Sequence, residues 1–330
     1  MQRMLGVVLL VGLSLGTAAE AQGPGGGRLR DLFGKTMTGQ LRAGETRETL
    51  EWGGEQREYV VHRPPGFPGN RRWPLVLLFH GGTGNAGQAL ESYGMREAAD
   101  RHGFVLVAPN GTGRTVLRVW NVQFGFGYAM QNQVDDVGFV RELVKRLEAR
   151  YPLDARRVFA TGISNGGILC HFLAAGIPST FAAIAPVVGT VGGKAPGQAD
   201  WQYPPSPSSP VAVIAFNGAK DDHIPVEGGR QRASFGEPVE VMSGLETSRF
   251  WVHADGCDPT PHTSEDEPHG STVTRYTGGR AGTEVELWVV HDQGHAWPGG
   301  KAPRLKADPP STLLDATETM WAFFERHPRR

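Results

Sequence analysis

The feature that most constrains this chain is the regular alternation of short apolar runs with longer helical stretches. The pattern predicts buried strands at 73–82, 104–111, 157–164, 181–189, 210–218 and 284–292. It predicts helices around 90–102, 137–150, 238–254 and 313–325, with one more directly after Ser164. Alternating strands and helices build a parallel sheet that is covered on both faces. We therefore predict an α/β fold with a mostly parallel central sheet and helices on both faces.

Four segments fall outside this alternation. Residues 48–54 and 57–64 are predicted to form two strands joined by a glycine turn. The aromatic-rich segment 119–130 and the proline-rich segment 194–210 are predicted to be long surface loops. In open α/β sheets the ligand crevice lies beyond the carboxyl ends of the strands, where such loops gather.

The first 21 residues have the pattern of a secretory signal peptide. A basic residue, Arg3, precedes an apolar stretch from Met4 to about Gly16, and small residues stand at Ala19 and Ala21. The apolar stretch is shorter than the roughly 20 residues that span a bilayer. We expect cleavage after Ala21, a secreted or periplasmic location, and no membrane span in the processed chain.

Charge and cysteine content exclude some classes of protein. The formal net charge is -1 and no run of like charge occurs, which argues against nucleic-acid partners and against a polybasic membrane patch. The two cysteines are Cys170 and Cys257. Cys170 falls in an apolar helical stretch, which favours a buried thiol, but a single bridge between the two stays open.

A serine stands between glycines where a predicted strand passes into a helix. The segment Gly162–Gly166 has the spacing G-x-S-x-G, in which a tight turn pushes the serine outward at the amino end of the following helix. There, the helix dipole and the backbone N–H of Asn165 both face a reacting carbonyl. This predicts Ser164 as a nucleophile; the alternative is a serine that only caps the helix.

A nucleophilic serine needs a base and an acid, which follow it in the order acid, then histidine, in this arrangement. Asp221 and Asp222 follow the strand at 210–218, and His291 and His295 follow the next strand. We predict His295 as the base because it stands in a glycine-flanked loop, whereas His291 belongs to the strand end. Asp221 is predicted as the acid, although spacing alone separates it poorly from Asp222.

A second oxyanion donor is expected in the loop after the first buried strand. The segment "FHGGTGNA" fits this position, and the backbone N–H of Gly82 or Thr83 would act beside that of Asn165. His80 is predicted to be a structural hydrogen-bonding residue. The aromatic loop offers Trp120, Phe124, Phe126 and Tyr128 as the lining of a substrate pocket, and core packing is an equal alternative for each of them. Trp120 and Trp297 are the two aromatic residues that we expect there, since Trp297 lies two residues from the predicted base.

Two other motifs are predicted to have no catalytic or metal-binding role. The segment "HDQGH" spaces two histidines as in zinc peptidases, but it follows a strand and contains Gly294, so we predict no helix there and no metal site. Asp135 and Asp136 start a predicted helix, and we expect them to cap it.

Together, "LLFHGGTGNA", "VDDVGFV", "TGISNGG" and "GHAWPGG" resemble the secreted esterase family of feruloyl esterases and polyhydroxybutyrate depolymerases, within the α/β-hydrolase fold. The resemblance places the family's acid on Asp221, in "NGAKDDHIP", its serine on Ser164 and its histidine on His295. Asn217 departs from a histidine that the family commonly carries. No cysteine follows His80 as in polyhydroxybutyrate depolymerases, which favours feruloyl or other carbohydrate-linked esters.

The residue pattern predicts a signal peptide at 1–21 and a flexible, Gly-rich segment at 22–40, followed by a single α/β-hydrolase catalytic domain at 41–330. The predicted triad and the resemblance together indicate a serine esterase that needs no cofactor and acts on a small or polymeric ester, of either the feruloyl or the hydroxyalkanoate type. A non-catalytic carbohydrate- or polymer-binding protein on the same fold and a serine peptidase remain the alternatives.

Overall fold

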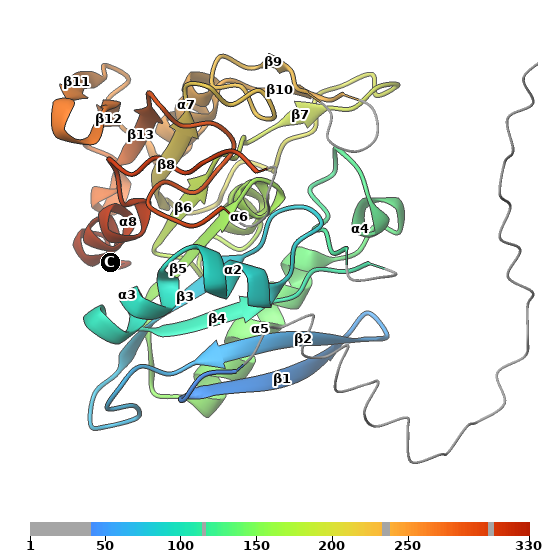
Figure 1. Ribbon diagram of the computed structural model, residues 1–330, viewed down its shortest axis with the longest axis vertical. Helices are drawn as coiled ribbons and strands as arrows, with labels where there is room; N and C mark the ends of the chain where they lie inside the picture. Colours follow the sequence, from blue (N-terminus) through green and yellow to red (C-terminus); the bar gives the residue numbers. More distant parts are fainter. Residues whose placement is uncertain (1–40, 114–116, 233–237, 303–306) are drawn as a thin grey trace, which may run out of the picture.

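Figure 1 shows the computed structural model, which describes residues 41–113, 117–232, 238–302 and 307–330. The predicted signal peptide (1–21) and the flexible segment (22–40) lie outside the described residues. Within the described ranges, no helix has the length and apolar character that crossing a membrane requires.

Ten strands form one large sheet. In spatial order they are β1 (Glu45–Trp52), β2 (Glu55–His62), β4 (Val105–Pro109), β3 (Trp73–Phe79), β5 (Leu153–Ile163), β6 (Ala183–Val187), β8 (Ala212–Gly218), β13 (Val285–Val290), β12 (Ser271–Tyr276) and β11 (His262–Asp266). The central strands from β4 to β13 run parallel, and two antiparallel strands extend the sheet at each edge. The fold is the predicted α/β-hydrolase class, with a mostly parallel central sheet.

Helices cover both faces of this sheet, as predicted (Figure 1). One face packs against α5 (Asp136–Arg150), α6 (Asn165–Gly176) and α7 (Gly244–Asp255). The other face packs against α2 (Ala86–Ser92), α3 (Met95–His102) and α8 (Ala316–Arg326). Alternate residues of β3 serve the two cores: Leu75 and Leu77 face the first, and Val76 and Leu78 face the second.

Two predicted helices differ from the observed ones. The stretch predicted around 90–102 forms α2 and α3, which are separated at Gly94, where φ is 68° and glycine is favoured. The stretch predicted at 238–254 begins its helix only at Gly244. Ser243 and Glu246 form a capping box there, which fixes the start of α7.

Several short or polar strands are not predicted by the apolar pattern. Strands β11 and β12 are largely polar, so they lack the apolar runs that mark buried strands. A small second sheet consists of β7 (Gly193–Lys194), β10 (Glu240–Val241) and β9 (Gly229–Arg230), and the aromatic loop contains the short helix α4 (Tyr128–Gln131). Cys170 and Cys257 are buried free thiols, so they do not form the disulfide that the sequence left open.

Candidate active site

Ser164 sits at a sharp turn between β5 and α6. Its backbone has φ 54° and ψ -123°, a positive φ that a non-glycine residue rarely adopts. The N–H of Ser164 donates to the carbonyl of Val187 on the neighbouring strand at 2.9 Å, and its own carbonyl accepts from Ile168 N–H at 2.8 Å. The turn therefore holds the serine in a strained conformation at the amino end of a 12-residue helix.

The glycines on either side of Ser164 are required by close backbone packing. A Cβ atom on Gly162 would lie 2.7 Å from the carbonyl oxygen of Phe79, and one on Gly166 would lie 2.5 Å from the same oxygen. Both distances are shorter than real Cβ contacts. The G-x-S-x-G spacing thus lets the turn press against the end of β3.

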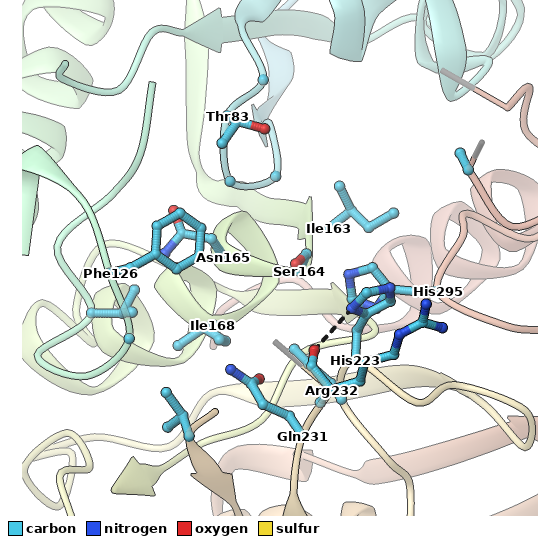
Figure 2. Close-up of a pocket in the computed structure, with 18 of the residues that line it drawn as sticks. Thr83, Phe126, Ile163, Ser164, Asn165, Ile168, His223, Gln231, Arg232 and His295 are labelled. Atoms are coloured by element: carbon cyan, nitrogen blue, oxygen red, sulfur yellow. Dashed lines mark hydrogen bonds between the residues drawn. The ribbon is translucent and has the colours of Figure 1, made fainter. Parts of the chain in front are cut away.

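Asp221 and His295 are hydrogen-bonded to each other. The Nδ1–H of His295 donates to Oδ2 of Asp221 at 2.8 Å. Oδ1 of Asp221 accepts the backbone N–H groups of His223 and Ile224 at 2.8 and 2.9 Å, so the fully buried carboxylate is held on both oxygens. This leaves Nε2 of His295 as the acceptor that faces the pocket, where Ser164 also lies (Figure 2).

The rejected candidates lie in different surroundings. Asp222 is exposed and pairs with Arg232 at 2.9 Å. The Nε2 atom of His291 lies 2.9 Å from the hydroxyl of Thr272 on β12, and its ring is half exposed. Residues 291–300 form turns and no helix, so His291 and His295 do not share a helical face. Among the described residues, no group of His, Cys, Asp and Glu is arranged to hold a metal ion.

His80 fixes the loop that follows β3. Its Nδ1–H donates to the carbonyl of Gly81 at 2.8 Å, and its Nε2 accepts the N–H of Gly111 at 3.0 Å. This pairing needs the neutral ring, and burial lowers the pKa of His80 to about 4. The structural role predicted for His80 agrees with these contacts.

The two predicted donors in this loop differ. The N–H of Thr83 donates to the carbonyl of Arg118 at 2.7 Å, so it already has a partner within the protein. Gly82 lies against Asn165, since a Cβ on Gly82 would be 3.7 Å from the Cβ of Asn165. Of the two candidates, Gly82 is therefore the one positioned beside the serine turn.

The prediction that Trp120 and Trp297 line a substrate pocket is wrong. Trp120 is fully buried, and its indole N–H donates to the carbonyl of His80 at 2.9 Å. Trp297 is 2% exposed, stacks on Tyr93 at 4.5 Å and donates to the hydroxyl of Thr317 at 3.0 Å. Each indole N–H has a hydrogen-bond partner inside the core. Both tryptophans therefore serve core packing, which was the alternative to a place in the pocket.

The two carboxylates before α5 have separate tasks. Asp135 caps the helix, because its side chain accepts the N–H of Gly138 at 2.8 Å. Asp136 is buried; it pairs with Arg57 at 2.7 Å and accepts the N–H of Asn121 at 2.8 Å. The capping prediction is correct for Asp135. Asp136 instead connects the aromatic loop, through Asn121, to β2, through Arg57.

A pocket of about 320 Å³ opens beside Ser164, and its two sides differ in polarity. Figure 2 shows Phe126 and Ile168 on one side of Ser164, and His223 and Arg232 on the side of His295, where the apolar Ile163 also lies. Val122 and Phe124 add to the apolar lining, and Gln231 and Asp308 add to the polar lining. Phe124 and Phe126 belong to the aromatic segment 119–130, which the sequence offers as a pocket lining. The other residues named here, apart from Ser164 and His295, are not predicted from the sequence. Of these, His223 could have been found from the sequence, because it lies two positions after the predicted acid Asp221.

Fold and site together define an α/β-hydrolase, with a serine, a histidine and a buried carboxylate assembled beyond the carboxyl ends of parallel strands. Residues 57–221, half of the chain, match the family described as Esterase PHB depolymerase, and the chain belongs to that family. It is accordingly a carboxylic ester hydrolase. His295 lies beyond the matched region.

Several relatives support this membership. Feruloyl esterase D of Neurospora crassa is 28% identical over 331 residues, which covers 96% of each chain. Feruloyl esterase B of Piromyces equi is 26% identical over 253 residues, 74% of this chain and 44% of that protein. Poly(3-hydroxyalkanoate) depolymerase C of Paucimonas lemoignei is 26% identical, over 72% of this chain and 58% of its own. The chain spans less than two thirds of the last two proteins.

Solved structures share the fold. The acetyl xylan esterase from Aspergillus awamori superposes with a TM-score of 0.55 at 14% identity, covering 84% of this chain and 99% of its own. An S-formylglutathione hydrolase from Agrobacterium tumefaciens gives a TM-score of 0.54 at 14% identity, covering 88% and 98%. At such identities the likeness concerns the fold alone.

Proposed function

We propose that this chain is an exported serine esterase that works through an acyl-enzyme on Ser164. The observation that carries the proposal is the 2.8 Å hydrogen bond from His295 to Asp221 in the pocket that Ser164 lines. In this reaction Nε2 of His295 takes the hydroxyl proton while the serine oxygen attacks the ester carbonyl. Asp221 orients the imidazole and stabilises its protonated form. The signal pattern at 1–21 supports export.

The negative charge that develops on the carbonyl oxygen would be held by the backbone N–H groups of Asn165 and Gly82. Asn165 is the first residue of α6, where the helix dipole also favours negative charge. When the tetrahedral intermediate collapses, His295 returns the proton to the leaving alcohol. Water then repeats the sequence, with His295 as the base, and releases the acid.

The route of the proton orients the ester in the pocket. Because His295 protonates the leaving oxygen, the alcohol portion lies on its side, beside His223, Gln231 and Arg232. The acyl portion then lies against Phe126 and Ile168 (Figure 2). Polar side chains suit a hydroxyl-rich alcohol, and phenyl rings suit a flat apolar acyl group.

This polarity favours aromatic acyl groups on carbohydrate alcohols over hydroxyalkanoates. A hydroxyalkanoate ester has similar aliphatic units on both sides of the scissile bond, so it would leave the polar side poorly matched. The relatives named feruloyl esterase support aromatic acyl esters as substrates. Because another relative is named poly(3-hydroxyalkanoate) depolymerase, hydroxyalkanoate esters are included in the test.

The test is a substrate panel with wild type and two serine variants. We expect methyl ferulate to be hydrolysed with a kcat/KM at least about 10-fold above that of hydroxybutyrate oligomers. Ser164→Ala should be at background, and Ser179→Ala, on an exposed serine beyond α6, should keep the wild-type rate. Equal rates for wild type and Ser164→Ala would reject the mechanism. Faster turnover of peptides than of esters would favour a peptidase.

A further inference from the structure

Trp120 connects the two segments that carry the proposed oxyanion donors. Its backbone N–H donates to Oδ1 of Asn165 at 2.7 Å, and its carbonyl accepts from Nδ2 of the same side chain at 3.2 Å. The residue directly after the nucleophile is therefore bonded twice to the aromatic loop.

The side chain of Trp120 reaches the other segment. Its indole N–H donates to the carbonyl of His80 at 2.9 Å, and its ring lies 4.9 Å from the His80 ring and 5.3 Å from that of Phe79. His80 precedes the loop of Gly81 and Gly82, and it also binds the carbonyl of Gly81. One buried residue thus contacts both the β3 loop and the start of α6.

We propose that Trp120 is a positioning residue that sets the spacing between the N–H groups of Gly82 and Asn165. Oxyanion donors act only when each lies about 2.7–3.1 Å from the developing charge, so two donors from separate segments need a fixed separation. Trp120 supplies it through three hydrogen bonds, one to each polar atom of the Asn165 amide and one to the His80 carbonyl. The proposal rests on the proposed function, because it concerns the oxyanion of the same reaction.

The test compares Trp120→Phe with Trp73→Phe. The first variant keeps an aromatic ring in the core; it removes the indole N–H that binds His80 and part of the buried ring system, a volume change that the control shares. Trp73 is a matched control: it is 3% exposed, and its indole N–H also donates to a backbone carbonyl, that of Pro68, at 2.7 Å. Trp73 begins β3, whereas the proposed site lies at the opposite end of this strand.

We expect Trp120→Phe to lower kcat about 10- to 100-fold with KM nearly unchanged. Affinity for a trifluoromethyl ketone, which forms the tetrahedral adduct, should fall in parallel, while affinity for the product acid stays constant. Trp73→Phe should lower the melting temperature to a similar degree and keep kcat. Asn165→Ala, which keeps its backbone N–H, should repeat the kcat loss and tests the same connection independently of Trp120.

The proposal is overturned if both Trp120→Phe and Asn165→Ala keep the wild-type kcat and ketone affinity while Ser164→Ala abolishes hydrolysis. It is also overturned if Trp73→Phe lowers kcat as much as Trp120→Phe, since the loss of kcat would then result from the lower stability of either variant. A wild-type chain that hydrolyses no ester overturns the proposed function itself, and this proposal with it.

Discussion

His295 and Asp221 stand 74 positions apart in the chain and share a 2.8 Å hydrogen bond. Each residue lies just beyond the carboxyl end of a strand, β13 and β8, and these two strands pair in parallel. Parallel pairing brings both loops to one edge of the sheet, where the turn after β5 also places Ser164. The register of the sheet therefore assembles the site.

Asp221→Asn should lower kcat by about 10⁴-fold, because an amide in place of the carboxylate no longer holds the imidazole in the required tautomer. The neighbouring variant Asp222→Asn makes the same chemical change on an exposed side chain and should alter kcat less than about threefold. Steady-state kinetics on one ester measures both. Similar losses in the two variants would argue against Asp221 as the acid.

Gly166→Ala should destabilise the fold and lower activity. The added Cβ would lie 2.5 Å from the carbonyl oxygens of both Phe79 and His80, so the serine turn must move away from β3. Overpacking of this kind costs about 1–3 kcal/mol. Thermal unfolding and kcat together check the prediction, and an unchanged melting temperature with full activity would contradict it.

The two sides of the pocket should be separable by mutation. Phe126→Ala should reduce kcat/KM for methyl ferulate about 10-fold and leave methyl butyrate nearly unaffected, since only the aromatic acyl group uses the ring. Arg232→Ala should affect a sugar ester of ferulate more than methyl ferulate. If Phe126→Ala instead altered the preference for the alcohol, the proposed orientation would be reversed.

Asp255 should make the fold less stable as pH rises. Burial raises the pKa of Asp255 from 3.8 to about 7. Between these values the unfolded chain has lost the proton that the folded chain keeps, so stability falls by about 1.4 kcal/mol per pH unit from about pH 4 to 7 and then levels off.

Asp255→Asn removes this dependence, and its Oδ1 can still accept the N–H of Val211. Urea denaturation of both proteins from pH 4 to 8 should show the variant gaining on wild type up to about pH 7. Parallel pH curves for the two proteins would show that Asp255 does not titrate in this range.

Much of the fold could be predicted from the sequence, and so could the three residues that we propose as the triad. The buried strands are continuous apolar runs, and Gly162 and Gly166 mark a turn that requires close backbone approach. Spacing alone, however, does not distinguish Asp221 from Asp222, and the preference for Asp221 depends mainly on the family resemblance. Its burial and its bonds to His223 and Ile224 appear only when the loop after β8 is folded.

The pocket could not be predicted in the same way. Trp120 and Phe126 belong to one aromatic loop, yet one is fully buried and the other lines the pocket. Trp120 is held in the core by hydrogen bonds to Asn165 and His80, which lie 45 and 40 positions away in the sequence. Gln231 and Arg232 follow the two-residue strand β9, which has no periodicity to detect.

The central claim is a covalent intermediate on Ser164, and mass spectrometry after labelling with a fluorophosphonate tests it most directly. We predict one adduct per chain, on the peptide that contains Ser164, and loss of labelling in His295→Ala because the hydroxyl then has no base. An unlabelled chain that still hydrolyses esters, or an adduct on a different residue, would contradict the account.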